Sequence, residues 1–248
     1  MSEGSAYAKS ERYYDAIYET MKDYSKESRR IRELVKRHKK SKGNALLDVA
    51  CGTGRHLSFL HKSFKAEGLD ADAKMLAIAR KRNSRVRFHK GNMVDFHLPS
   101  KFDVITCLFS AIGYVKTLSG FRAAIRNMAE HLKPGGVLIV EPWLTPQAFK
   151  RRHVGAVFVN QPKLKIARIN IAKIKGRIST MTFHYLIGTP EGIRHFTEPH
   201  KLGLFTRSEY LAAFRDCGLK VAYYSKGLIG RGLYVGMLPP KNPGKLMG

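Results

Sequence analysis

Residues 45–56 read A-L-L-D-V-A-C-G-T-G-R-H, and this stretch decides the fold. Its apolar start predicts a short strand that ends at Asp48. A turn with Gly52 and Gly54 follows, and apolar residues at helical spacing resume at Leu57 and Leu60. A strand, a glycine turn and a helix in this order let backbone N–H groups come close to a nucleotide-like ligand.

The turn lacks the residues of two common nucleotide sites. It has no third glycine for a dinucleotide fingerprint and no Gly-Lys-Ser/Thr for a phosphate loop. The pattern Asp-x-x-Cys-Gly-Thr-Gly, from Asp48 to Gly54, instead resembles the first motif of class I S-adenosylmethionine-dependent methyltransferases. The resemblance implies that the turn wraps the amino-acid end of the cofactor and that an acid ending the next strand holds its ribose.

An acid stands where this ribose ligand is expected. Residues 65–70 read K-A-E-G-L-D, a second strand ending in Asp70 at about the spacing of nucleotide-binding α/β folds. A carboxylate accepts hydrogen bonds from vicinal hydroxyls better than an amide does. Asp70 could instead cap the helix expected over 71–82, but Asp72 is better placed for that role. After a third strand at 85–89, the resemblance implies that Asn92 and Met93 contact the adenine ring.

The remaining core elements alternate strand and helix. We expect a buried strand over 102–108, a helix over 119–132 that stops at Lys133-Pro134-Gly135-Gly136, and a strand over 137–140. A helix over 208–217 and strands over 219–224 and 232–237 follow the insert described below. The predicted fold is α/β, a Rossmann-like class I methyltransferase sheet that is mostly parallel with an antiparallel last strand. Ligands of such sheets lie beyond the carboxyl ends of the strands.

Residues 144–203 interrupt this pattern and predict an antiparallel β insert. Residues 163–175 alternate apolar and basic side chains, with a slip near Ala167 that suggests a bulge. Thr180, Thr182 and His184 share one face of the next strand, and a further strand over 194–205 is interrupted at Pro199. We expect the insert to cover the substrate, and a dimerisation sheet is the alternative. The predicted organisation is an N-terminal helical cap at 1–42, a core at 43–143 and 204–238, the insert, and a tail at 239–248.

A closer resemblance runs through nearly the whole chain. The segments Y-D-A-I-Y at 14–18, K-D-Y at 22–24, C-L-F-S-A-I-G at 107–113, E-P-W at 141–143 and G-R-G-L-Y-V-G at 230–236 are similar to the N,N-dimethyltransferases of nucleotide-linked amino sugars. This resemblance implies that Tyr14 and Tyr24 lie near the cofactor and the acceptor amine. It also implies that strands of the insert contact a sugar and its pyrophosphate.

Together these arguments predict three sets of site residues and no metal. The cofactor set is Tyr14, Tyr24, Asp48, Ala50, Cys51, Gly52, Gly54, Asp70, Ala71, Met75, Asn92, Met93, Leu108, Phe109 and Ser110. The substrate set is Tyr18, Trp143, Arg168 and Arg231. In the catalytic set, Tyr14 orients the amine or relays its proton, and His184, His200 or Glu198 accepts it.

The net charge of the chain does not by itself identify the methyl acceptor. Lys and Arg number 45 against 19 Asp and Glu, so the formal charge is +26, and such a field attracts anions. One basic run, residues 29–42, also has an apolar side and is interpreted as a solvated helix face. The insert has eleven basic residues and only two acids, which fits a small phosphorylated amine. The alternative is a methyltransferase that grips RNA or a protein as a polyanion, and a catalytically silent cofactor-binding scaffold is a third hypothesis.

Length and composition frame these hypotheses. A chain of 248 residues can bury one sizeable core and an elaboration. Three cysteines, none in a Cys-x-x-Cys pair, favour a reducing compartment without disulfides or zinc. No leader or membrane-spanning run is apparent, so we expect a cytoplasmic protein.

Overall fold

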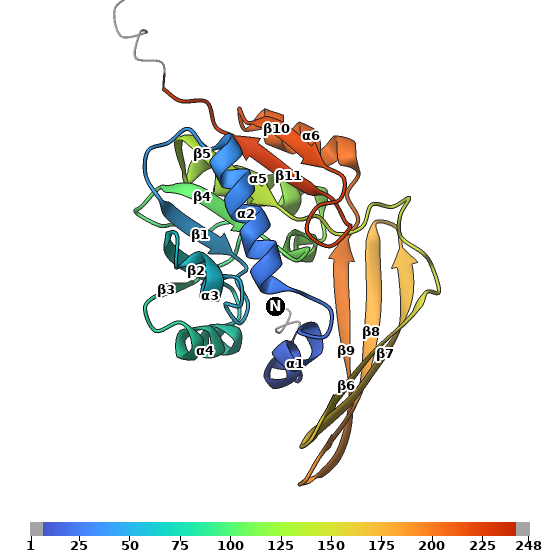
Figure 1. Ribbon diagram of the computed structural model, residues 1–248. Coiled ribbons are helices and arrows are strands. Elements are labelled where there is room, and N and C mark those ends of the chain that lie inside the picture. The colour runs from blue at the N-terminus through green and yellow to red at the C-terminus, as the bar shows by residue number, and fades with distance from the viewer. Residues whose placement is uncertain (1–6, 242–248) are drawn as a thin grey trace, which may run out of the picture.

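Seven strands form a central sheet in the order β10-β11-β5-β4-β1-β2-β3 in the computed structural model, which describes residues 7–241 (Figure 1). Strand β11 runs antiparallel to both of its neighbours, and the other pairs are parallel. The predicted mixed sheet is confirmed. The strands are β1 (Ala45–Val49), β2 (Lys65–Asp70), β3 (Arg87–Lys90), β4 (Phe102–Cys107), β5 (Leu132–Val140), β10 (Lys220–Tyr224) and β11 (Leu233–Met237).

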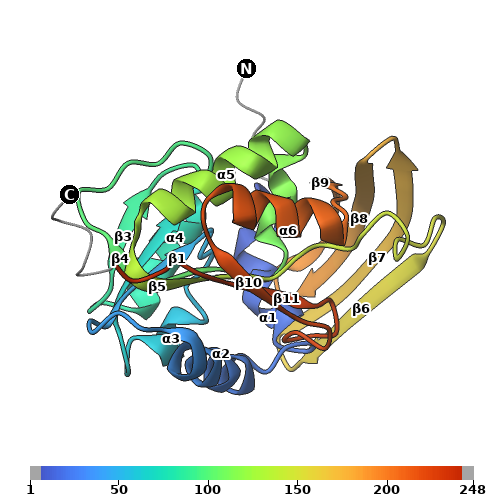
Figure 2. The same cartoon turned by 90° about the horizontal axis from the view of Figure 1, so that it is seen from above.

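Helices cover both faces of this sheet (Figure 2). One face carries α2 (Tyr24–His38), α3 (Leu57–Leu60) and α4 (Ala73–Arg82), and the other carries α5 (Leu118–Glu130) and α6 (Arg207–Asp216). Successive strand residues alternate between the two apolar layers, as the pleat requires: Leu46 and Val104 face α2–α4, whereas Leu47 and Ile105 face α5 and α6. Across residues 7–241, no helix has the length and apolar character needed to cross a membrane.

The basic run before the first strand folds as predicted. It forms most of α2, where Ile31, Leu34 and Val35 are buried while the basic side chains remain largely exposed. Asp23 caps the helix by accepting a hydrogen bond from the N–H of Lys26. Before α2 lie η1 (Glu11–Tyr13) and α1 (Tyr14–Tyr18). Residues 1–6 of the predicted cap and 242–248 of the predicted tail lie outside the described residues.

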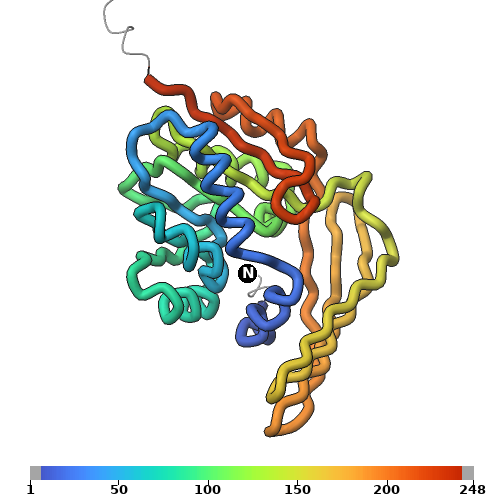
Figure 3. The backbone as a smooth tube through the Cα atoms, in the orientation of Figure 1, coloured from blue at the N-terminus to red at the C-terminus, as the bar shows by residue number. Residues whose placement is uncertain are grey.

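A second, antiparallel sheet projects from the core (Figure 3). Its strands follow in chain order, so each pairs with the next along the chain. The inner face packs against the N-terminal segment and α1, and the other face is directed outward. The strands are β6 (Val154–Gln161), β7 (Leu164–Lys175), β8 (Ile178–Thr189) and β9 (Gly192–Gly203).

One strand of this insert was not predicted, and two predictions for it are wrong. Strand β6 was not expected. It is an edge strand in which only Val159 is buried, so apolar and polar residues do not alternate clearly along its sequence. The bulge near Ala167 is absent, since β7 and β8 pair without a register shift. Ile166 faces inward while Ile169 faces outward. Apolar residues on both faces of one regular strand therefore produce the same sequence pattern as a bulge. Pro199 does not interrupt β9, because β9 is an edge strand and proline, which has no N–H, is tolerated there without the loss of a ladder hydrogen bond.

The end of α5 also differs from the expectation. The helix ends at Glu130, and β5 already begins at Leu132 and passes through Pro134 and Gly135. The pairing of β4 with β5 shifts register beyond the Phe102–Leu132 pair, and Gly135 has a φ of 79°. The Pro-Gly-Gly segment is therefore an irregularity inside a strand and not the connection before one.

Candidate active site

The glycine turn and Asp70 meet at the carboxyl edge of the central sheet. Strands β1 and β2 are parallel neighbours, so their carboxyl ends lie side by side. The carboxylate of Asp70 accepts hydrogen bonds from the N–H of Gly52 (2.7 Å) and of Asp72 (2.8 Å). The side chain of Asp72 caps α4, as predicted. Each oxygen of Asp70 keeps a lone pair for a ligand hydroxyl, which the expected ribose contact requires.

A cavity that is open to solvent lies beside this turn. It gathers eight of the predicted cofactor residues: Tyr14, Tyr24, Asp48, Ala50, Cys51, Gly52, Leu108 and Phe109. Asp70 adjoins it through Gly52, whereas Asn92 is exposed and accepts a hydrogen bond from the N–H of Val94. The remaining predicted members do not line this cavity: Gly54, Ala71, Met75, Met93 and Ser110.

Three lining residues were missed from the sequence. Thr53, Arg55 and His56 all belong to the opening stretch 45–56, so their position in the turn was the available signal. Thr53 and Arg55 also fix α1 over the cavity. The hydroxyl of Thr53 donates to Asp15 (2.7 Å), and Arg55 forms an ion pair with Glu19.

The cavity fits the predicted cofactor. The hydroxyl of Tyr24 and Nε of Arg55 are buried and have no hydrogen-bond partner within residues 7–241, and the guanidinium lies 5.3 Å from the Tyr24 ring centroid. These donors suit the carboxylate of an amino acid. A side chain at Gly52 would meet no atom within 4 Å, so the turn leaves open space there. The aromatic faces of Tyr14 and Phe109 suit a sulfonium cation.

A buried cluster of charged side chains contacts residues that line the cavity. Glu27 Oε2 accepts from Lys22 (2.8 Å) and lies 2.8 Å from Nε2 of His56. Burial alone would raise the pKa of Glu27, but His56 and Lys22 outweigh burial and hold that pKa below its ordinary value. The Lys22 ammonium also lies 4.1 Å from the centroid of Phe109. The cluster therefore fixes two lining side chains, His56 and Phe109.

The turn after β4 holds a strained pair of residues. Phe109 and Ser110 have φ values of 51° and 63°, which side chains other than glycine rarely adopt. Glu141 stabilises this turn by accepting from the N–H of Phe109 (2.6 Å), and burial raises the pKa of Glu141. Strain of this kind, costing about 1–3 kcal/mol per residue, is typical of functional turns.

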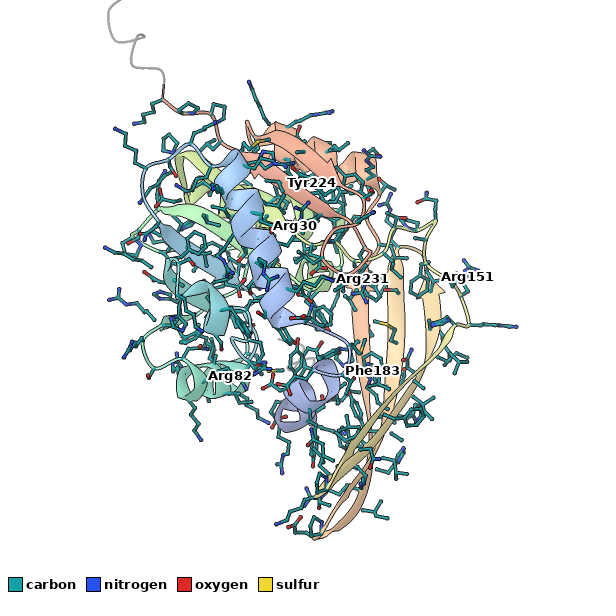
Figure 4. The ribbon with its side chains drawn as sticks, viewed as in Figure 1. Arg30, Arg82, Arg151, Phe183, Tyr224 and Arg231 are labelled. Atoms are coloured by element: carbon teal, nitrogen blue, oxygen red, sulfur yellow. The ribbon has the colours of Figure 1, made fainter. Side chains whose placement is uncertain are left out.

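Arg231 and Trp143 border the same turn, and Figure 4 shows Arg231 at the junction of the two sheets. The guanidinium of Arg231 lies 4.6 Å from the ring centroid of Trp143 and donates to the hydroxyl of Ser110 (3.0 Å). Arg231 is partly exposed, so it can reach a ligand. Trp143 is buried, and its Nε1 donates to Ser179 (3.0 Å).

Aromatic rings lead from the cavity to the insert. Tyr18 packs against Tyr14 with centroids 4.5 Å apart and against Phe109 at 4.9 Å. The guanidinium of Arg168 lies 5.1 Å from the Tyr18 centroid and 4.4 Å from that of Phe183, which Figure 4 shows on the insert near α1. Burial raises the pKa of Tyr14 well above its ordinary value, so this hydroxyl remains protonated.

The three predicted proton acceptors lie in different environments. His200 is buried beside this aromatic cluster and its Nδ1 lies 2.7 Å from the hydroxyl of Tyr114. Burial, and then the charge of Arg168, lower the pKa of His200 to about 3. Glu198 accepts hydrogen bonds from Ser10 and from the N–H of Lys9, which occupies its carboxylate. His184 is exposed on the outer face of the insert, where it stacks on His195, so the fold does not bring it to the cavity.

Comparisons with known proteins agree with this geometry. The methyltransferase-domain family model matches residues 46–136. The dTDP-3-amino-3,4,6-trideoxy-alpha-D-glucopyranose N,N-dimethyltransferase of Streptomyces venezuelae is 41% identical over 227 residues, which cover 90% of this chain and 95% of that protein. The dTDP-3-amino-3,6-dideoxy-alpha-D-glucopyranose N,N-dimethyltransferase of Streptomyces fradiae is also 41% identical, over 90% of this chain and 89% of that protein.

Solved structures give the same result over the whole fold. The crystal structure of Streptomyces venezuelae DesVI is similar with a TM-score of 0.86 and 39% identity, covering 96% of this chain and 99% of that chain. CalS10 of Micromonospora echinaspora, an amino pentose methyltransferase solved with bound S-adenosylmethionine, has a TM-score of 0.84 and 37% identity over 96% of this chain and 100% of that chain. The chain therefore belongs to the class I S-adenosylmethionine-dependent methyltransferases, in the family of the dTDP-amino-sugar N,N-dimethyltransferases.

Proposed function

We propose that this enzyme methylates the amino group of a nucleotide-linked amino sugar. The observation that carries the proposal is the match to relatives with this activity over nine tenths of the chain, insert included. In this proposal residues 1–42 cap the cofactor, residues 43–143 and 204–238 form the catalytic core, and residues 144–203 cover the acceptor. The cofactor set expected from the sequence is kept in this proposal, with Arg55 added.

The residues around the cavity have distinct roles in this proposal. Asp70 holds the ribose, and Arg55 and Tyr24 hold the carboxylate of the cofactor, whose sulfonium supplies the methyl group. Tyr14, Tyr18 and Phe109 form an aromatic wall that excludes water and orients the amine. Positioning of two reactants in this way can supply about 7–11 kcal/mol of the barrier in favourable cases. Arg231 and Trp143 border the acceptor and its phosphates.

Proton removal does not need a strong base in this site. His200 stays neutral but is too weak a base to hold the proton of an ammonium, because its pKa lies near 3. Glu198 already accepts three hydrogen bonds, from the N–H groups of Lys9 and Ser10 and from the hydroxyl of Ser10. We therefore assign His200 the role of hydrogen-bond acceptor through Nε2, which is buried and has no partner among residues 7–241. His184 has no contact with the proposed acceptor site.

Turnover of a defined acceptor tests the proposal. The enzyme is incubated with isotopically labelled S-adenosylmethionine and dTDP-3-amino-3,4,6-trideoxy-α-D-glucopyranose, and the product is identified by mass spectrometry. Addition of methyl groups at nitrogen is the expected result. Transfer to RNA or protein with a steep salt dependence, and none to the amino sugar, would favour the polyanion alternative that the charge of +26 allows.

A Tyr14→Phe variant is expected to lose more turnover than cofactor affinity. The ring keeps its packing on Tyr18, but the hydroxyl that orients the amine is lost. One neutral hydrogen bond is worth about 0.5–1.5 kcal/mol, so kcat should fall roughly 2- to 12-fold. Steady-state kinetics and calorimetric titration of the cofactor measure the two effects. Equal losses in kcat and in cofactor affinity would make Tyr14 a cofactor-binding residue instead.

We also propose that the outer face of the insert pairs with a second copy of the chain. Of the seven exposed large apolar side chains among residues 7–241, six lie on this face. Residues paired across the four strands form rows on this face, and the three central rows contain no Asp, Glu, Lys or Arg. Such a surface does not suit a polyanion. Four strands of this length present about 700 Å², close to the roughly 800 Å² per partner of a standard interface. The six side chains are Val154, Phe158, Ile169, Ile171, Leu186 and Ile193.

An Ile169→Glu variant is expected to be monomeric under conditions in which the wild type is a dimer. Ile169 lies on β7, in the middle of the outer face, and a buried unpaired carboxylate there would oppose association. Sedimentation velocity measures the change. The matched control is Met21→Glu, since Met21 is equally exposed but lies outside the insert. A wild type that is monomeric at all concentrations would contradict this proposal.

A further inference from the structure

Arg168 is a buried cation that has no counter-ion among residues 7–241. Its side chain extends from the inner face of β7, and the residue is only 5% exposed. None of the ion pairs found between described residues includes it, and its Nε and Nη1 have no hydrogen-bond partner there. Its neighbours are the rings of Tyr18 and Phe183. In the proposed function the amine lies beside Tyr14, Tyr18 and Phe109, in what we call the acceptor pocket, and Arg168 lies on the other side of the Tyr18 ring.

The surroundings of Arg168 contain few negative charges that could cancel this field. Tyrosines dominate, and burial keeps their hydroxyls protonated. Glu198 accepts hydrogen bonds from Lys9 and Ser10 and Glu141 accepts one from the N–H of Phe109, and among residues 7–241 neither forms an ion pair with Arg168. The titratable and charged groups that face the pocket are Tyr7, Tyr14, Tyr18, Tyr24, Tyr114, Arg168, Tyr185, Glu198, His200, Arg231, Glu141, Asp15 and Lys22.

We propose that Arg168 makes the acceptor bind as the neutral amine, by disfavouring a second positive charge in this pocket. This inference rests on the proposed function. The proton of the free ammonium passes to solvent as the substrate enters, and the lone pair of the nitrogen then forms the bond to the methyl carbon. The methylated product is an ammonium, which the same charge disfavours, so it loses its proton to solvent before any second transfer.

The distances make the effect large enough to measure. Arg168 is separated from Tyr14 and Phe109, which line the cofactor cavity, by the single ring of Tyr18. A unit charge at such a separation, in the effective dielectric of a protein, lowers the pKa of an amine by about one to two units. His200 experiences the same field, because Arg168 is the charged group that lowers its pKa after burial. A neutral amine is the nucleophile, so no general base is required.

The pH dependence of kcat tests this role in the intact enzyme. The acceptor is dTDP-3-amino-3,4,6-trideoxy-α-D-glucopyranose, whose free amine is titrated separately. In the wild type, the acidic limb of kcat should lie one to two pH units below that free value, whereas kcat/KM follows the free amine. Arg168→Gln should move the kcat limb up toward the free value, and Arg168→Lys, which keeps the charge, should leave it in place. Arg194→Gln is the control, because Arg194 is an exposed cation of the same sheet.

Proton release on binding of the acceptor is a second measurement, and it is made on the wild-type enzyme alone. Calorimetry with S-adenosylhomocysteine and the amino sugar, repeated in buffers of different ionisation enthalpy, should show roughly 0.4 to 0.8 proton released per acceptor at a pH one unit below the free amine's pKa, for a pKa that binding lowers by about one to two units. A kcat limb that coincides with the free amine, or binding without proton release, overturns the role of Arg168. Absence of methylation of the amino sugar at every pH would overturn the proposed function itself, and the two failures are therefore distinct.

Discussion

An Asp70→Ala variant is expected to bind S-adenosylmethionine roughly 10- to 150-fold more weakly than the wild type. The carboxylate lies at the carboxyl end of β2, and its free lone pairs face the ligand edge of the sheet. Hydrogen bonds to a charged group contribute about 1.5–3 kcal/mol, which gives this range. Part of the lost affinity would come from a less ordered turn, because Asp70 also accepts a hydrogen bond from the N–H of Gly52. Calorimetric titration of the cofactor measures the effect.

Asp72→Ala is the matched control for this variant. Asp72 lies two residues away and caps α4 through the N–H groups of Lys74 and Met75. Loss of this cap should lower the free energy of unfolding by about 1 kcal/mol and leave cofactor affinity within twofold. Unchanged affinity in Asp70→Ala would remove the ribose role. A similar loss of cofactor affinity in both variants would indicate that Asp70 acts by ordering the local turn and not by binding the ribose.

A Glu27→Gln variant is expected to lose about 3–5 kcal/mol of folding stability, the largest effect on stability that we predict. The Lys22 side chain is only 1% exposed and Glu27 is its ion-pair partner, so the substitution leaves a buried ammonium uncompensated. His56 loses the same partner. Urea unfolding measures the change. The control is Glu33→Gln in the same helix, where an exposed pair with Arg30 is worth at most about 0.5 kcal/mol.

The pH dependence of stability identifies the carboxylate as the cause. The folded pKa of Glu27 lies below its ordinary value of 4.5, so the charge cluster contributes its full stability above about pH 4.5. That contribution is lost as the pH falls through the folded pKa. The wild type and Glu27→Gln should therefore differ most near neutral pH and converge in acid. A constant difference across this range would contradict the assignment.

The sequence determined the nucleotide-binding half of this protein. The pattern from Ala45 to Gly54, with Asp70 after it, is set by local backbone requirements: a buried strand, a left-handed turn at Gly52 and an acid at a strand end. Such requirements are encoded within a few residues and can be recognised without the fold. The mostly parallel sheet followed from the alternation of strands and helices, whereas the order of the strands came from the structure.

The insert was less accessible to sequence reasoning. Its register was misjudged because β7 has apolar residues on both faces, so alternation along the chain does not reveal which side is buried. Pro199 suggested a break because the edge position of β9 is a property of the sheet and not of the local sequence.

Only the tertiary structure decided how the acceptor side is arranged. Arg168 is separated by more than a hundred residues from Tyr18, yet the two side chains are in contact. No local pattern predicts that the guanidinium is buried with no counter-ion in the described part of the chain. The sequence grouped His184, His200 and Glu198 by residue type, whereas the pleat directs His184 outward and the fold buries the other two. Residue type determines what chemistry a side chain can perform. Burial and long-range packing determine its charge and its neighbours, and these arise only when the chain has folded.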